Sequence, residues 1–279
     1  MCPLLLIMSE DEIILTHILK CRPIDLALNM PVLTATQQEQ FENYQHRRAA
    51  GEPLQYILGT CNFMGLELAV NPSVLVPRPE TEQLVDAALK CFKGGIALDL
   101  GTGSGNIAIA LAKFVPQSQI VSVDISAKAL EVARANARFY GVEGRIKFIQ
   151  GDMFVSLRGA EGDAAISKQG LLHFARNDKF DLIISNPPYI PTNQLNSLPK
   201  DVQQEPASAL DGGEDGLNFY RIIIQYTPRL LRSSACLMME FGDGQAEAIK
   251  KLIEAQRAFS KIEIIQDLAG RDRIIKAIK

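Results

Sequence analysis

Leu98-Asp99-Leu100-Gly101-Thr102-Gly103-Ser104-Gly105 is the stretch of the chain that decides its fold class. An apolar run typical of a buried strand leads into a glycine-rich turn, and a helix-forming run follows up to Phe114. Glycines permit a tight turn and close approach of the backbone to a ligand, and the first turn of a helix offers free N–H groups. The spacing G-x-G-x-G differs from the dinucleotide-binding G-x-G-x-x-G. The stretch predicts a strand, a ligand-binding turn and a helix, although a plain strand-to-helix turn fits the same pattern.

Strands and helices alternate on the C-terminal side of this unit, which predicts an α/β fold. Strands are expected at 96–100, 119–124, 146–150, 180–185, 236–241, 261–267 and 273–279, and helices at 81–92, 105–114, 127–140, 216–231 and 245–257. This order favours an open, mostly parallel sheet that is covered on both faces. The last two strands have no helix between them, so we expect a hairpin and an antiparallel C-terminal edge.

The chain has a different character before residue 77. Apolar residues recur at helical spacing, and polar breaks divide them into several short helices. Residues 59–76 contain two short apolar segments that predict a β-hairpin. We therefore expect a small helical domain with a hairpin linker at 1–76 and an α/β domain at 77–279. The Gly/Ala-rich and polar residues 156–178 predict a surface insertion.

Bulk composition narrows the class of protein. The chain has 47% hydrophobic and 22% charged residues and a net charge of −3, typical of a soluble globular protein without the basic stripe of a nucleic-acid binder. The five cysteines share no C-x-x-C spacing, which favours reduced thiols in the cytoplasm over disulfides, and we expect no metal site. The apolar residues 1–8 are too short for a signal peptide or a membrane span.

Two acidic residues are candidate ligand contacts. Asp124 ends a strand 23 positions after Gly101, where a carboxylate can accept hydrogen bonds from ribose hydroxyls. It could equally be a helix cap. After the next strand, Asp152 is placed to hold an adenine amino group and Met153 to pack against its ring, although a surface turn with an apolar anchor fits as well. At this point NAD and S-adenosylmethionine both remain open as cofactors.

Asn186-Pro187-Pro188-Tyr189 follows the predicted strand 180–185. The two prolines end the strand, so the chain continues as a stiff extended loop. The Asn186 side chain and the Pro187 carbonyl are both acceptors and could hold the two N–H bonds of one –NH₂ group. Tyr189 offers a flat face for packing. The tetrapeptide predicts a methyl-transfer site for a planar amide or exocyclic amine, because a poor nucleophile gains most from fixed orientation.

The chain resembles the PrmC/HemK family of peptide-chain release factor glutamine methyltransferases. The resemblance covers nearly the whole chain and rests on residues 51–57 with Gly59, residues 76–82, Leu98–Gly105, Asp124, residues 186–190, Glu205-Pro206, Ala209-Leu210, Gly212-Gly213, Asp215-Gly216-Leu217 and Glu240-Phe241-Gly242. It departs from the family in the length of 156–178 and in having Met153 where some members have an aromatic residue.

The resemblance implies a Rossmann-like class I methyltransferase domain that binds S-adenosylmethionine, and a helical domain that helps to dock the protein substrate. The reaction would be N5-methylation of the glutamine in the Gly-Gly-Gln motif of class 1 release factors. The implied cofactor contacts are Gly101, Thr102, Gly103, Ser104, Gly105, Asp124, Met153 and Asn186, with Asp152 beside them. Asn186, Pro187, Pro188 and Tyr189 would hold the glutamine amide, with Asn186, Pro187 and Tyr189 as catalytic residues. Arg78 and Glu80-Thr81 would brace the pocket, although Pro79 and the acidic residues also suit a helix start.

Three alternatives remain. An adenine-N6 methyltransferase of DNA or RNA uses the same tetrapeptide, because an exocyclic amine poses the same hydrogen-bonding problem. The absence of a basic stripe disfavours it, since Arg47-Arg48 is better explained by a salt-bridged face. A ribosomal-protein glutamine methyltransferase would share the catalytic domain, but residues 78–81 fit the release-factor enzymes better. A nucleoside-binding regulator would leave the two acceptors unexplained.

Overall fold

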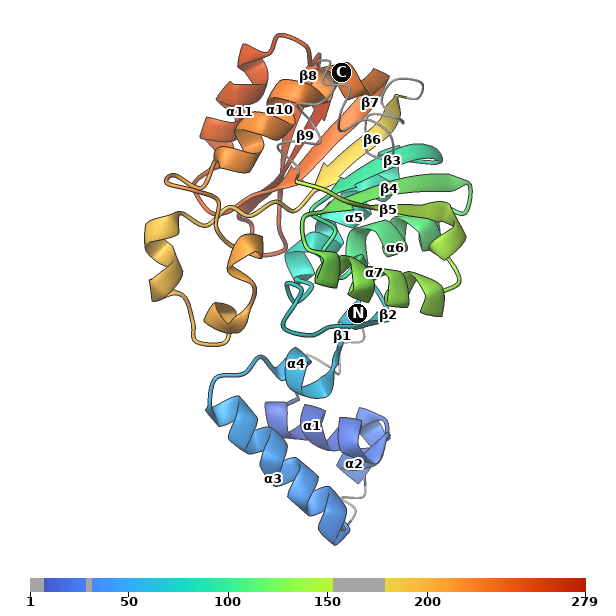
Figure 1. The fold of residues 1–279 in the computed structure, drawn as a ribbon, viewed down its shortest axis with the longest axis vertical. Coiled ribbons are helices and arrows are strands. Elements are labelled where there is room, and N and C mark those ends of the chain that lie inside the picture. The colour runs from blue at the N-terminus through green and yellow to red at the C-terminus, as the bar shows by residue number, and fades with distance from the viewer. Residues whose placement is uncertain (1–7, 29–31, 153–178) are drawn as a thin grey trace.

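The computed structural model describes residues 8–28, 32–152 and 179–279, and Figure 1 shows a helical N-terminal part below a larger α/β domain. The α/β domain is built on a seven-stranded sheet with the strand order β5-β4-β3-β6-β7-β9-β8. The strands are β3 (Gly95–Leu100), β4 (Ser118–Asp124), β5 (Ile146–Gln150), β6 (Phe180–Ser185), β7 (Leu231–Glu240), β8 (Lys261–Gln266) and β9 (Asp272–Ile278). The first five run parallel, whereas β9 runs antiparallel to both of its neighbours, which confirms the predicted mixed sheet.

Helices cover both faces of the sheet. The flanking helices are α5 (Pro79–Cys91), α6 (Asn106–Phe114), α7 (Ala127–Phe139), α10 (Asn218–Leu230) and α11 (Ala246–Ala255). Successive strand residues point to opposite faces, so Ala97 packs in one core with α5, α6 and α7, and Leu98 packs in the other with α10 and α11. Among the described residues, no helix is long and apolar enough to cross a membrane.

Most element boundaries lie within two residues of expectation, and the starts of α5 and β7 differ for a physical reason. Helix α5 begins at Pro79 rather than at residue 81, because proline at the first helical position lacks only an N–H that would have no partner there. Strand β7 begins at Leu231, five residues early. Leu231 pairs with Phe180, and the register then shifts before Leu182 pairs with Cys236. Because the residues between Leu231 and Cys236 are mostly polar, the apolar pattern of the sequence did not show where the strand begins.

The N-terminal part is helical and ends in a hairpin, as predicted. It consists of α1 (Glu10–Leu19), α2 (Pro23–Leu28), α3 (Ala35–Ala49) and α4 (Leu54–Leu58), followed by the antiparallel strands β1 (Thr60–Phe63) and β2 (Leu66–Ala69). Arg48 on α3 bonds to Glu10 on α1 and also reaches Asp201 of the α/β domain. Arg47 pairs with Glu52, so the expected salt-bridged face at Arg47-Arg48 is present. The boundary between residues 76 and 77 stays a prediction, and the expected insertion at 156–178 lies outside the described residues.

Candidate active site

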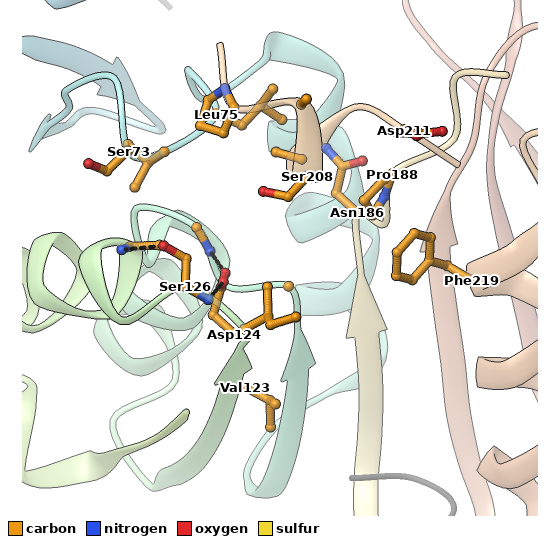
Figure 2. Close-up of a pocket in the computed structure, with 18 of the residues that line it drawn as sticks. Ser73, Leu75, Val123, Asp124, Ser126, Asn186, Pro188, Ser208, Asp211 and Phe219 are labelled. Atoms are coloured by element: carbon orange, nitrogen blue, oxygen red, sulfur yellow. Dashed lines mark hydrogen bonds between the residues drawn. The ribbon is translucent and has the colours of Figure 1, made fainter. Parts of the chain in front are cut away.

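A cavity of about 370 Å³ opens at the carboxyl ends of β3, β4 and β6 (Figure 2). Open α/β sheets bind ligands at this edge, where the strand order reverses between neighbouring strands. The described residues that line it are Ser73, Val74, Leu75, Gly101, Gly103, Val123, Asp124, Ile125, Ser126, Ala129, Gly151, Asp152, Asn186, Pro188, Pro206, Ala207, Ser208, Ala209, Asp211 and Phe219.

Asp124 ends β4 and contributes a carboxylate to the cavity. Its Oδ2 accepts the N–H of Gly103 at 2.9 Å and its Oδ1 accepts the N–H of Ser126 at 2.8 Å. Burial raises the pKa of Asp124, and these backbone N–H donors oppose that shift. A carboxylate oxygen has two lone pairs, so each oxygen keeps one acceptor position. Asp124 is therefore held rigidly and can still accept two hydroxyl donors from a ligand.

The glycine-rich turn contributes backbone rather than side chains. Gly101 and Gly103 line the cavity, and a Cβ added to Gly103 would meet no atom within 4 Å and so would project into open space. Thr102 and Ser104 are buried. The Thr102 hydroxyl donates to Asp99 at 2.6 Å, and Gly105 packs against α6 and α7. Of the five turn residues proposed as cofactor contacts, three therefore support the turn from behind.

Of the two candidate residues that follow β5, Asp152 and Met153, the structure describes only the first. Asp152 lines the cavity beside Gly151, as the sequence suggested, whereas Met153 lies outside the described residues. Ile125 offers an apolar side chain in its place. It follows Asp124, lines the cavity and is 58% exposed although it is a large hydrophobic residue. An apolar residue directly after the acidic residue that ends the strand is the sequence signal that could have identified it.

A second cavity, of about 290 Å³, adjoins the first. Its described lining is Leu75, Arg78, Glu80, Asn186, Tyr189, Ile190, Val202, Ala209, Leu210 and Arg273. Leu75, Asn186 and Ala209 line both cavities. Asn186 thus stands at the junction between a nucleoside-sized space and a smaller one with charged walls.

The side chain of Asn186 is oriented by a neighbouring hydroxyl. Its Nδ2 donates to Thr81 Oγ1 at 2.9 Å, and Thr81 in turn donates to Glu240 Oε2 at 2.7 Å. Because the nitrogen is engaged, Oδ1 is the part of the amide that can accept a hydrogen bond from a ligand. The acceptor role that the sequence suggested for Asn186 stays a prediction, and this orientation leaves its oxygen available for it.

The rest of the tetrapeptide follows as an extended loop. Pro187 is buried and Pro188 lines the first cavity, whereas Tyr189 lines the second. A Cβ on Gly212 would lie 2.8 Å from the Tyr189 Cα, so only glycine lets the two segments approach this closely. The Tyr189 carbonyl also accepts from Gln245 at 2.9 Å. The loop is therefore fixed on both sides.

The segment after the hairpin closes one wall of both cavities. Glu205 accepts the Val76 N–H at 3.1 Å and the Arg78 guanidinium at 2.5 Å, and its side chain is 2% exposed. Burial raises the pKa of Glu205, and Arg78 opposes the shift. Tyr56 on α4 donates to the Val74 carbonyl at 2.5 Å. Arg78 thus braces the pocket, as the resemblance implied.

Several lining residues were not identified from the sequence as ligand contacts. They are Ser73–Leu75 after the hairpin, Pro206–Ala209 in the loop before Leu210, and Phe219 at the start of α10. These segments come from distant parts of the chain, and no local pattern marks them as neighbours of Asp124. Only the family resemblance pointed to Glu205-Pro206 and Ala209-Leu210.

Comparison with known proteins agrees with this geometry. Residues 92–266 match the family described as methyltransferase domain, and residues 9–59 match the PrmC N-terminal domain. The chain is 43% identical over 237 residues to a release factor glutamine methyltransferase of Moorella thermoacetica, covering 84% of this chain and 77% of the relative. It is 38% identical over 272 residues to the protein of that name from Thermodesulfovibrio yellowstonii, covering 95% of this chain and 90% of the relative.

The fold has a counterpart among solved structures. A methyltransferase from Pyrococcus furiosus superposes with a TM-score of 0.54 at 18% identity, covering 85% of this chain and 98% of the other. At that identity the match bears on the fold alone. The relatives decide the family, because they are 43% and 38% identical over most of this chain and the match to the second covers both the helical part and the α/β domain. The chain belongs to the release factor glutamine methyltransferase family.

Proposed function

We propose that this protein transfers a methyl group from S-adenosylmethionine to the side-chain N5 of the glutamine in the Gly-Gly-Gln motif of class 1 release factors. The observation that carries the proposal is the position of Asn186 in the wall of both cavities. One cavity suits a nucleoside cofactor and the other a small polar side chain. Because the substrate is a translation factor, the proposal sets the reaction in the cytoplasm.

The residues of the first cavity fit S-adenosylmethionine. Asp124 keeps two acceptor positions for ribose hydroxyls, and Gly103 leaves open space beside it. Ile125 offers an apolar surface for the adenine ring, and Asp152, which lines the same cavity, offers an acceptor for the adenine amine. When bound, the cofactor supplies an electrophilic methyl group on a sulfonium.

The second cavity fits a glutamine side chain. Asn186 Oδ1 can accept one N–H of the substrate amide, and the Pro187 carbonyl, on which no hydrogen bond from the described residues ends, can accept the other. Hydrogen bonds to these oxygens stabilise positive charge as it develops on the nitrogen. Tyr189 supplies an apolar face, and the glycines beside the substrate glutamine let its backbone come close.

The proposal is tested by methyl transfer from cofactor labelled in its methyl group. Purified class 1 release factor, a ribosomal-protein preparation and duplex DNA serve as substrates in parallel. We expect label in the release factor and none in the DNA. A release factor in which the Gly-Gly-Gln glutamine is replaced by alanine is the matched control and should remain unlabelled. Label in DNA or ribosomal protein alone would overturn the proposal.

A further inference from the structure

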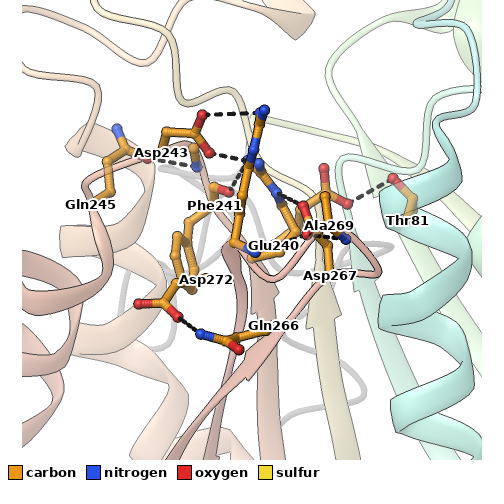
Figure 3. Close-up of polar contacts among 12 residues, drawn as sticks. Thr81, Glu240, Phe241, Asp243, Gln245, Gln266, Asp267, Ala269 and Asp272 are labelled. Carbon is orange, nitrogen blue, oxygen red and sulfur yellow. Dashed lines mark hydrogen bonds and ion pairs between the residues drawn. The ribbon is translucent and has the colours of Figure 1, made fainter.

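Glu240 is a buried acidic residue to which the methyl-transfer chemistry above assigns no role. It ends β7, next to β6, where Ser185 pairs with Met239 and the chain then continues to Asn186. Glu240 and Thr81 are each 1% exposed. Figure 3 shows Thr81 on α5 reaching across to the Glu240 carboxylate at the end of β7. The Tyr220 hydroxyl fixes the Glu240 backbone by donating to its carbonyl at 2.7 Å.

The chemistry of an ionised carboxylate gives this hydrogen-bond chain a direction. A carboxylate can only accept, so the single proton of the Thr81 hydroxyl is donated to Glu240. The Thr81 oxygen then accepts, and its partner Asn186 must present its –NH₂ group. The Asn186 oxygen is consequently left for the ligand.

A neutral Glu240 removes this constraint. Its carboxylic O–H can donate to Thr81, whose hydroxyl proton is then released to donate to the oxygen of a rotated Asn186 amide. In that arrangement Asn186 would present an –NH₂ group to the substrate –NH₂ group, and two donors cannot pair. The direction of the chain therefore decides whether Asn186 can hold its substrate.

We propose that Glu240 and Thr81 are positioning residues that fix the orientation of the Asn186 amide, and that transfer requires the ionised form of Glu240. The inference rests on the proposed function, because Asn186 acts on the substrate amide. Neither residue needs to touch the reacting atoms.

The charges around Glu240 make this hydrogen-bond chain dependent on pH. Burial raises the pKa of Glu240 to about 7, and the nearby Glu80 adds to the shift, while the Thr81 hydroxyl, Arg273 and Arg78 oppose it. The neighbouring Tyr189 and Tyr220 have pKa values raised by burial and stay neutral in this range. The carboxylate therefore predominates above pH 7 and is lost as the pH falls through that value. We expect kcat to decline on the acid side with a midpoint near pH 7.

The test compares kcat, KM and cofactor affinity for the parent and three variants from pH 5.5 to 9. Thr81→Val removes the hydroxyl with little change of shape, and Thr81→Ser restores a hydroxyl. Glu240→Gln imitates a permanently neutral side chain. Thr227→Val is the matched control, because it removes another buried threonine hydroxyl, one that donates to the Ile223 carbonyl within α10. Thermal melting and cofactor titration establish that each variant is folded.

We expect Thr81→Val to lower kcat about tenfold or more with the cofactor Kd unchanged, Thr81→Ser to recover most of it, and Thr227→Val to behave as the parent. Glu240→Gln should lose the acid limb, because its amide does not titrate between pH 5.5 and 9. A Thr81→Val enzyme with parental kcat, or a Glu240→Gln enzyme with the parental pH profile, would overturn the inference. If any variant fails to fold, a parent profile that is flat from pH 5.5 to 9 overturns it. A parent that methylates no glutamine would instead contradict the proposed function.

Discussion

Replacement of Asp124 by alanine tests the cofactor site with a magnitude that follows from its geometry. The carboxylate has one acceptor position left on each oxygen after bonding Gly103 and Ser126. Two hydroxyl donors from a ribose would fill those positions. Hydrogen bonds to a charged group contribute about 1.5–3 kcal/mol each, and neighbouring bonds are not additive, so we expect a loss of about 2–4 kcal/mol. At about 1.4 kcal/mol per tenfold change, the cofactor Kd should rise about 30- to 700-fold.

Isothermal titration with S-adenosylmethionine measures this change separately from catalysis. Asp181→Ala is the matched control. Its carboxylate also accepts a backbone N–H, that of Ile96 at 2.8 Å, but it lies at the amino end of β6, opposite the cavity. We expect the control to bind cofactor as the parent does. A folded Asp124→Ala protein with a Kd within twofold of the parent would show that this carboxylate does not bind the ribose hydroxyls.

The remaining predictions concern Asn186, the ion pair between Arg78 and Glu205, and the cysteines. Asn186→Ala should lower kcat about a hundredfold or more while cofactor Kd changes only a few fold, because the lost acceptor faces the substrate amide. Arg78→Ala should lower the free energy of unfolding in urea by about 3 kcal/mol, because Glu205 would be left buried without its positively charged partner. Cys91 should be alkylated faster than Cys61 at pH 7.5, as read by peptide mass spectrometry. The Cys236 thiol lowers the Cys91 pKa, and burial raises the pKa of Cys61 to about 11.

Each of these has a contradicting outcome. If Asn186→Ala turns over at the parental rate, the Asn186 side chain does not hold the substrate amide during transfer. An Arg78→Ala protein within about 0.5 kcal/mol of the parent would show that Glu205 is stabilised by other groups. Equal alkylation rates at Cys91 and Cys61 would contradict the opposite pKa shifts of these two thiols.

The fold and the strand-end residues could be predicted because their signals are local. The alternation of apolar strands with helices placed Asp124 and Asn186 at carboxyl ends of parallel strands, and such ends meet at one edge of a sheet. The insertion of β9 between β7 and β8 was not specified by that pattern, since a hairpin can add to a sheet in either order.

The support of the site could not be predicted, because it depends on contacts between distant segments. Thr81 and Glu240 are separated by 159 positions, and Arg78 and Glu205 by 127. Taken alone, residues 78–82 predict only a helix start. Thr102 and Ser104 illustrate the converse. Their place in the glycine-rich turn suggested cofactor contact, but their side chains are buried behind it.

The most direct test of the account is the mass of the substrate peptide. Release factor is incubated with the protein and S-adenosylmethionine, digested, and the Gly-Gly-Gln peptide is sequenced by tandem mass spectrometry. We predict a gain of one methylene unit on the glutamine side chain with the parent enzyme and no gain with Asn186→Ala. An unmodified glutamine after incubation with folded, cofactor-binding parent enzyme would contradict it.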